Sequence, residues 1–169
     1  MIHVRLARTS DAPELKKLND LFNGTDSNSA RAIEESLAHT NQEIVCVAAK
    51  GDGDSSKLIG FCCGQIVNSM CYSILYGDIT ELFLLEKYSS QNVGKQLVEL
   101  VESEFNKRGV NHLHHFVGKG NLLARELFRS LGYADTTENS YGSSSILIFE
   151  KDTCICERRS HANGPKAKR

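Results

Sequence analysis

The chain has 169 residues, of which 40% are apolar and 24% charged, and its formal net charge is −1. This length suits one domain that can bury roughly 70% of its unfolded surface without a disulfide or metal, and the composition excludes a disordered, collagen-like or coiled-coil chain. No apolar run reaches the ~18–20 residues of a membrane helix, and the first residues resemble no secretory signal. We therefore expect a cytoplasmic protein that binds neither membrane nor nucleic acid.

The first half of the chain predicts strands and helices in alternation. Residues 3–7 form a short alternating strand, and a helix capped by Thr9 or Ser10 ends at Asn23-Gly24. A second helix is predicted over residues 29–40. The predicted strands at 43–49 and 58–67 flank a turn-rich loop, and a long strand spans 72–85, with a bulge or bend expected at Gly77-Asp78.

The second half contains the clearest helix, over residues 94–108, whose apolar positions share one face until Gly109 stops it. We then expect a strand at 110–118, a helix at 121–131, and a hairpin of 133–135 with 144–150. The whole order predicts an α/β (α+β) fold with a mixed, mostly antiparallel sheet of about six to seven strands and about four helices.

The C-terminal end differs from the rest in charge. Residues 157–169 carry a net charge of +4, which leaves −5 on the preceding residues. We therefore predict a domain over residues 1–152 and a basic tail over 153–169. The tail is interpreted as a solvated, mobile terminus, and docking on an acidic partner is the alternative.

The six cysteines are interpreted as free thiols in a reducing compartment. Cys46, Cys62, Cys63 and Cys71 lie in apolar runs, where a thiol behaves as a small buried hydrophobe. Cys154, Cys156 and His161 lack a fourth ligand and a CxxC spacing, so no metal site is predicted there.

A short polar loop, residues 89–93, joins a predicted strand to the helix that begins near Gly94. A helix N-terminus presents unpaired N–H groups and the positive end of the helix dipole, which together bind phosphate. Small residues in the loop let a pyrophosphate approach the backbone. Loops of this kind also occur without a ligand, so the pattern alone is weak.

This region resembles the GNAT superfamily of acyl-CoA-dependent N-acetyltransferases. The loop signature reads Tyr88-Ser89-Ser90-Gln91-Asn92-Val93-Gly94-Lys95, and the more specific second motif reads Asn121-Leu-Leu-Ala124, then Phe128 and Leu131-Gly132-Tyr133. The opening VRLARTSDAPELKKL is similar to the first strand and helix of the family. The resemblance spans residues 1–150 and implies a GNAT fold with two splayed central strands.

The resemblance implies a cofactor site for acetyl-CoA between those splayed strands, and no metal. Backbone groups at Phe83, Leu84 and Leu85 would pair with pantetheine, and the N–H of Phe83 or Leu84 would hold the thioester oxygen. The pyrophosphate would bind to Ser89, Ser90, Gln91, Asn92, Val93, Gly94 and Lys95, and Asn121 and Phe128 would also contact the cofactor. A homodimer is left open, because dimers are common in the family.

Three positions depart from the family pattern. Ser89 stands where Arg or Gln is usual, and Asn92 replaces the first glycine, although Asn tolerates left-handed backbone. Phe128 replaces a frequent Tyr whose hydroxyl can protonate the leaving thiolate. Tyr133 and Tyr141 are other hydroxyls that could take that role, or the thiolate needs no acid.

Glu81 is the candidate catalytic residue. The stretch from Asp78 to Leu84 resembles the acidic-hydrophobic strand of family members that acetylate small amines, including polyamines. Alternation places Glu81 on one face with Phe83, where it could take a proton from the amine or attract a cation. A solvent-facing strand glutamate is the alternative. Asp78, Tyr76 and Tyr72, upstream on this strand, could line the amine pocket, whereas Glu34 and Glu35 are interpreted as a solvated helix face.

Three histidines stand together at residues 112–115. Alternation puts His112 and His114 on one face and His115 on the other, which argues against a shared metal. His115 is interpreted as a hydrogen-bonded core residue, with a proton relay as the alternative. The resulting hypothesis is an N-acetyltransferase that acts on a small cationic primary amine by direct attack. The alternative is a catalytically degenerate GNAT-fold module that binds acyl-CoA.

Overall fold

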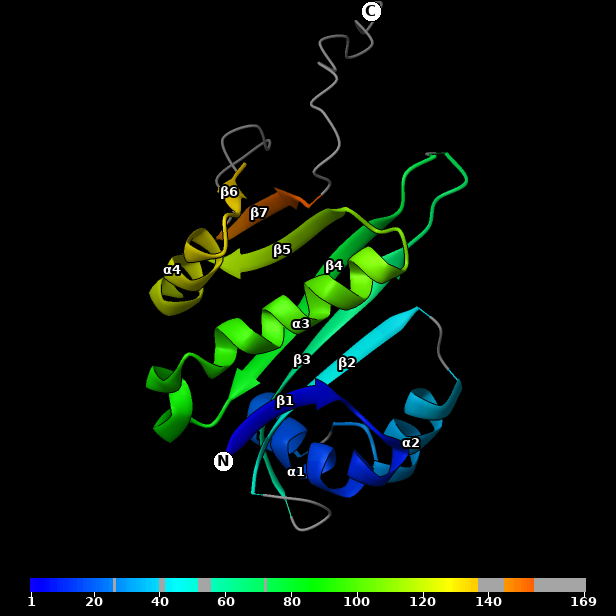
Figure 1. Cartoon of the computed structure of the whole chain (residues 1–169), viewed down its shortest axis with the longest axis vertical. Coiled ribbons are helices and arrows are strands. Elements are labelled where there is room, and N and C mark those ends of the chain that lie inside the picture. Colours follow the sequence, from blue (N-terminus) through cyan, green and yellow to red (C-terminus); the bar gives the residue numbers. More distant parts are fainter. Residues whose placement is uncertain (26, 40–41, 52–55, 72, 137–144, 154–169) are drawn as a thin grey trace, which may run out of the picture.

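The computed structural model describes residues 1–25, 27–39, 42–51, 56–71, 73–136 and 145–153. Its centre is a seven-stranded sheet in the order β1-β2-β3-β4-β5-β7-β6 (Figure 1). The strands are β1 (Ile2–Leu6), β2 (Glu43–Lys50), β3 (Lys57–Val67), β4 (Tyr76–Leu84), β5 (His112–Gly118), β6 (Ala134–Asp135) and β7 (Ile146–Asp152). The number of strands and the mixed sheet confirm the predicted fold class.

Helices cover both faces of this sheet. The helices are α1 (Ala12–Asn23), α2 (Ala30–His39), α3 (Val93–Lys107) and α4 (Leu122–Ser130), with short 3-10 turns η1 (Thr9–Asp11) and η3 (Glu86–Gln91). On one face, which we call the α3 face, Leu97, Val101 and Phe105 are fully buried against the strands. On the opposite face, the α1 face, Leu15 and Leu18 pack against Val47 and Phe61.

Most element boundaries agree with the sequence expectations. The long central strand begins at Tyr76 rather than residue 72, and η3 was not anticipated. Cys46 and Cys62 are buried as predicted, but Cys71 is exposed, so the prediction for Cys71 was wrong. The predictions for Tyr72, Tyr141, Cys154, Cys156, His161 and the tail from residue 154 onward fall outside the described residues.

The sheet divides between β4 and β5. These two strands are the parallel pair, and they pair only over four positions, from Tyr76–His112 to Ile79–His115. Beyond Ile79, β4 stays paired to β3, and beyond His115, β5 stays paired to β7. The splayed central strands are therefore confirmed, and we call the point where they part, at Ile79 and His115, the fork.

A β-bulge lies at the same place. Cys63 pairs with Glu81 while the next residue of β3, Gly64, pairs with Ile79, so Thr80 is the extra residue of β4. The bulge expected at Gly77-Asp78 was therefore misplaced. Glycine is needed at residue 77 for a different reason. A Cβ there would come within 3.0 Å of the Leu113 and Phe105 side chains.

His115 closes the fork on the α3 face. Its Nδ1 lies 2.6 Å from the carbonyl oxygen of Ile79, and its ring stacks on Phe128 at a centroid distance of 4.0 Å. Because only a protonated nitrogen donates to a carbonyl, Nδ1 carries the proton. Burial lowers the pKa of His115, so the ring is neutral at pH 7. The interpretation of His115 as a hydrogen-bonded core residue is confirmed.

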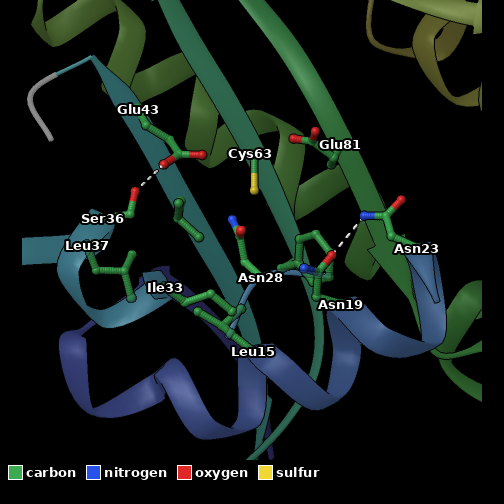
Figure 2. Close-up of a pocket in the computed structure, with 12 residues that line it drawn as sticks. Leu15, Asn19, Asn23, Asn28, Ile33, Ser36, Leu37, Glu43, Cys63 and Glu81 are labelled. Atoms are coloured by element: carbon green, nitrogen blue, oxygen red, sulfur yellow. Dashed lines mark hydrogen bonds between the residues drawn. The ribbon is translucent and has the colours of Figure 1, made fainter. Parts of the chain in front are cut away.

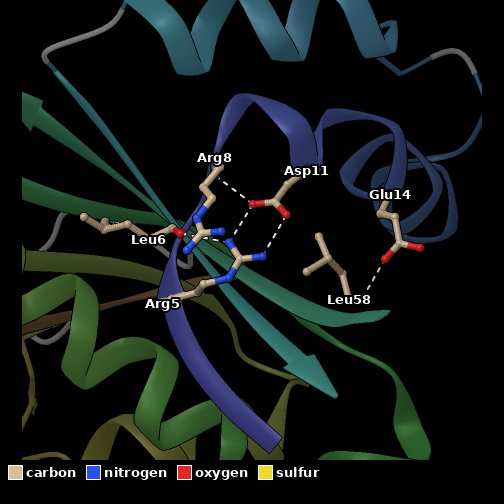
Figure 3. A network of polar contacts seen from close by, with 6 residues as sticks. All are labelled: Arg5, Leu6, Arg8, Asp11, Glu14 and Leu58. Atoms are coloured by element: carbon tan, nitrogen blue, oxygen red, sulfur yellow. Dashed lines mark hydrogen bonds and ion pairs between the residues drawn. The ribbon is translucent and has the colours of Figure 1, made fainter. Parts of the chain in front are cut away.

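An ion pair fixes α1 against the sheet (Figure 3). Both nitrogens of the Arg5 fork bond to the Asp11 carboxylate, at 2.7 and 2.8 Å, and the Arg8 N–H donates to it at 2.7 Å. On the next turn, Glu14 accepts a 2.7 Å hydrogen bond from the N–H of Leu58. These bonds tie the beginning of α1 to β1 and β3.

We predict that Asp11→Asn weakens the fold by about 2 kcal/mol, the usual contribution of hydrogen bonds to a charged group. Burial alone would raise the pKa of Asp11, but the hydrogen bonds from Arg5 and Arg8 outweigh it and lower the pKa. The stabilisation is therefore complete above the unfolded pKa of about 3.9 and is lost as pH falls below it. Urea unfolding at pH 7 and pH 3 measures both effects. Glu35→Gln, in an exposed pair with Arg31, is the control and should change stability by less than about 0.5 kcal/mol.

His115→Phe should destabilise the fold by about 1–3 kcal/mol, because it leaves the Ile79 carbonyl without its donor. Since the folded pKa of His115 lies below its unfolded value of about 6.5, the contribution is complete above pH 6.5 and shrinks as pH falls further. Thermal unfolding of both proteins across pH 5–8 measures the difference. A stability difference that grows toward low pH would contradict this assignment.

Candidate active site

A pocket of about 240 Å³ opens on the α1 face, between the two N-terminal helices and strands β2 to β4 (Figure 2). One of the predicted site residues, Glu81, lies in its lining. The lining residues are Leu15, Asn19, Asn23, Asn28, Ile33, Ser36, Leu37, Glu43, Val45, Phe61, Cys63 and Glu81. The pocket therefore combines an apolar floor with amide, hydroxyl and carboxylate groups.

All the formal charge in this lining is negative. Of the twelve described residues around the pocket, Glu43 and Glu81 are the charged ones. The Ser36 hydroxyl donates to the Glu43 carboxylate at 2.9 Å, and the Thr80 hydroxyl donates to that of Glu81. Each carboxylate is thus oriented by a neighbouring hydroxyl. The bulge at Thr80 is what brings Glu81 to this face two residues after Ile79, which faces the opposite way.

Cys63 lies between the two carboxylates in Figure 2. Burial is the main reason that the pKa of Cys63 is raised, and the nearby negative charges of Glu81 and Glu43 raise it further. The thiol is therefore protonated and a poor nucleophile at neutral pH. It forms part of the pocket surface.

Asp78 and Tyr76 lie on the same strand as Glu81 but do not line this pocket. Asp78 is 3.4 Å from Nδ1 of His114, its partner across the strands, and the Tyr76 ring lies 5.1 Å from the His114 ring. The interaction with Asp78 raises the pKa of His114, and Glu150 adds to the effect from 3.8 Å. These groups form a second polar cluster beside the fork.

The beginning of α3 has the geometry expected of an anion site. Asn92 adopts the left-handed conformation (φ 59°), and its side chain caps no N–H of the helix. The first intrahelical bond runs from the N–H of Gln96 to the carbonyl of Asn92, which leaves the N–H groups of Val93, Gly94 and Lys95 without helical acceptors. A Cβ at Gly94 would meet only the Leu127 side chain, at 3.7 Å, so packing does not demand glycine there.

The backbone of β4 presents free groups to the widening gap. The N–H of Leu85 donates to the Ile59 carbonyl of β3 at 2.9 Å. Because successive backbone groups of a strand point to opposite sides, the N–H of Leu84 points away from β3 and toward the gap, whereas that of Phe83 points toward β3. Phe83 and Leu84 are the two residues whose N–H could donate to the thioester oxygen, and the geometry favours the N–H of Leu84.

The remaining predicted cofactor residues occupy different surroundings. Ser89, Ser90 and Gln91 belong to η3, where the Ser89 hydroxyl donates to the Glu86 carbonyl at 2.8 Å. Asn121 is the N-cap of α4, and its side-chain oxygen accepts from the Ala124 N–H at 3.1 Å. Phe128 is fully buried beside His115 and has no surface open to a ligand in this structure. Its contact with a cofactor stays a prediction.

The residues that sequence reasoning missed come from the N-terminal helices and β2. Glu43 and the three asparagines belong to segments that carry no recognisable motif. A charged residue at the start of a strand followed by six apolar or small residues was the one local signal for Glu43. Its proximity to Glu81 depends on strand pairing.

Two other observations bear on function class. Among the described residues, no three His, Cys, Asp or Glu side chains come together as a metal site would require. In the same part of the chain, no helix has the length and apolar character to cross a membrane.

Known proteins with similar sequence or structure agree on one family. Residues 13–133 match the model of the acetyltransferase (GNAT) family. An uncharacterized N-acetyltransferase of Chlorobaculum tepidum is 26% identical over 92% of this chain and 88% of its own length. Similar folds occur in Arabidopsis thaliana NAA60 with acetyl-CoA (TM-score 0.70) and in PaiA N-acetyltransferase of Thermoplasma acidophilum with coenzyme A (TM-score 0.68). Each is 17% identical over 90% of this chain and 99% of its own. Because the family match covers most of the described fold, including the fork and the α3 loop, the chain is an acetyltransferase of the GNAT family.

Proposed function

We propose that this acetyltransferase moves the acetyl group of acetyl-CoA to a primary amine of a small cationic molecule by direct attack. One observation carries the proposal: Glu81 stands on β4 just beyond the fork and lines a pocket whose formal charges are negative. A pocket of that charge attracts ammonium ions and disfavours anionic acceptors. The strand that would hold the thioester thus also provides the carboxylate.

The residues at the start of α3 fit the pyrophosphate of this cosubstrate. The N–H groups of Val93, Gly94 and Lys95 would donate to it, with Ser89, Ser90, Gln91 and Asn92 completing the loop. Asn92 already holds the left-handed conformation that the family achieves with glycine. The substitution therefore preserves the backbone shape of the cradle.

Along β4, the backbone of Leu84 would bind the pantetheine arm, between Phe83 and Leu85. The Leu85 backbone is already bonded, because its N–H donates to the Ile59 carbonyl and its carbonyl accepts from the N–H of Tyr88. The N–H of Leu84 would hold the thioester oxygen as negative charge develops on it during attack. Acetyl-CoA supplies an activated acyl group. What the chain would supply is this fixed donor and the alignment of the amine.

Glu81 would receive the proton that the amine must lose to attack at neutral pH, directly or through a water. Its carboxylate also favours binding of the cationic acceptor. Asp78 and Tyr76 would line the acceptor's approach from the side of the fork. Proton transfer and recognition thus share one strand.

The thiolate of coenzyme A leaves without an evident protein acid. Phe128 has no hydroxyl, and burial, with the nearby Glu102 carboxylate, raises the pKa of Tyr133 far above neutral pH. Tyr133 is therefore a poor proton donor from where it lies. We propose that water protonates the thiolate.

Glu81→Gln should lower kcat about 100-fold and leave the affinity for acetyl-CoA unchanged, because removal of a general base slows a reaction by a factor of about 10²–10⁴. The defect should narrow at high pH, where the amine is neutral without help. Thiol release with a monoamine, measured from pH 6 to pH 10, tests both points. Glu34→Gln, an exposed residue of α2, is the charge-matched control. Unchanged turnover in the Glu81 variant at every pH would exclude its role.

Gly94→Val should weaken acetyl-CoA binding at least tenfold, about 1.4 kcal/mol. The branched side chain would occupy the space that the pyrophosphate needs, while the fold has room for the first carbon. Calorimetric titration with acetyl-CoA measures the change, and thermal unfolding checks that the variant is folded. Equal affinity of the two proteins would mean that the cofactor does not use this loop.

A further inference from the structure

The proposed reaction removes two protons from the nitrogen of the acceptor. The acceptor arrives as an ammonium ion and leaves as a secondary amide, so its nitrogen loses one proton before the attack and another after it. One of the two ends on the sulfur of coenzyme A through water, and the other is released to solvent. Glu81 would take the first proton, and a carboxylic acid that already holds a proton has no basic form left for the second. A second proton acceptor near the fork would complete the transfer.

His114 lies at the fork on the same face of the sheet as Glu81. Its neighbour His115 is buried on the α3 face, so alternation along β5 places His114 on the α1 face, where Glu81 lines the pocket. His114 pairs with Asp78 one position before the fork, and Glu81 is three residues beyond Asp78 on β4. At a rise of about 3.3 Å per residue, the two positions are about 10 Å apart along the strands. The histidine and the carboxylate therefore flank the opening of the gap from opposite strands.

Each ring nitrogen of His114 faces a carboxylate. Nδ1 lies 3.4 Å from Oδ1 of Asp78 on β4, and Nε2 lies 3.8 Å from Oε1 of Glu150 on β7. Oδ1 of Asp78 is buried and accepts no hydrogen bond from a described residue, which favours a proton on the nitrogen that faces it. Nε2 of the neutral ring then keeps a lone pair that can accept a proton, and the charge of Glu150 stabilises the imidazolium ion that results.

The carboxylates around His114 favour its protonated form. Asp78 is the first cause of its raised pKa, and Glu150 and Asp152 act in the same direction, whereas partial burial opposes them. His112, on the same strand and face, is paired with Asp152 at 2.5 Å. Since the ordinary pKa of histidine is about 6.5, the carboxylates bring it toward the pH at which a general base is most effective.

His114 also has access to water away from the gap. It lines a second pocket of about 610 Å³ together with Tyr76 and Glu150, and 26% of its side chain is exposed. The Tyr76 ring lies 5.1 Å from the imidazole ring and forms the neighbouring part of the pocket wall. Water in this pocket can take a proton from the imidazolium ion while acetyl-CoA and the acceptor occupy the gap.

We propose that His114 is the second proton acceptor of acetyl transfer and that Asp78 is the residue that positions it. The C–N bond forms, and the nitrogen of the tetrahedral intermediate passes its second proton through water to Nε2 of His114. The C–S bond then breaks with its electron pair on sulfur, and the imidazolium ion releases its proton to solvent. The inference rests on the proposed function, since it concerns the same transfer.

The test measures kcat from pH 5 to pH 9, with saturating acetyl-CoA and pentylamine, for the unmodified protein, His114→Gln and the control His112→Gln. In the unmodified protein kcat should fall as pH drops through the pKa of His114, because a protonated ring accepts no further proton. His114→Gln should lower kcat at pH 8 at least tenfold and remove this fall, since one proton transfer contributes a factor of about 10²–10⁴. His112→Gln should keep both the rate and its pH dependence.

Two further variants separate proton transfer from a structural role. Asp78→Asn keeps the imidazole but removes the first cause of its raised pKa, so the fall in kcat should move to lower pH. His114→Ala should regain activity when imidazole is added, because the second pocket admits a small base to the vacated position. Thermal unfolding confirms that each variant is folded.

Other results would overturn the inference in distinguishable ways. An unchanged kcat and pH dependence in His114→Gln would exclude the role of His114 and leave the acetyltransferase proposal intact. A loss of kcat in His114→Ala that imidazole does not restore would assign the residue a structural role. Acetyl-CoA binding without acetylation of pentylamine by the unmodified protein would overturn the proposed function together with the inference.

Discussion

The hydrogen bond from His115 to the Ile79 carbonyl is the contact on which the site geometry depends. Where two paired strands separate, their backbone groups lose partners, and a buried carbonyl without a donor is costly. His115 satisfies the carbonyl from the α3 face, and Phe128 holds the imidazole ring in place. The fork is thereby stable on one face, while the backbone of β4 beyond it remains available to a ligand.

Strand β4 joins the two halves of the proposed chemistry. Beyond the fork its Leu84 N–H points toward the gap that leads to α3, and its side chain at Glu81 faces the pocket under α1 and α2. The bulge at Thr80 turns the Glu81 side chain to the pocket face. Without the extra residue, Glu81 and Ile79 would point to the same face of the sheet. The Arg5–Asp11 ion pair also shapes the pocket, because it fixes α1, the helix that forms one wall of it.

Local patterns, together with the family resemblance that they carry, were sufficient to predict the fold, and the cofactor residues that they name stay a prediction. The loop from Tyr88 to Gly94 and the motif at Asn121 lie within short stretches of chain, and their backbone shapes follow from local rules such as the left-handed tolerance of Asn92. The acceptor side could not be predicted in this way. Glu43 and Glu81 line the same pocket only because of the register of β2 and β4 with β3, and the position of the bulge depends on that pairing rather than on Gly77.

Hydrogen–deuterium exchange of the protein with and without acetyl-CoA tests the central claim most directly, which is that the cosubstrate lies in the fork and reaches the start of α3. The account predicts slower exchange at the Leu84 amide and at the amides of Val93, Gly94 and Lys95, with little change in β1 and β2. Binding of acetyl-CoA that leaves all four of these amides unprotected would contradict it.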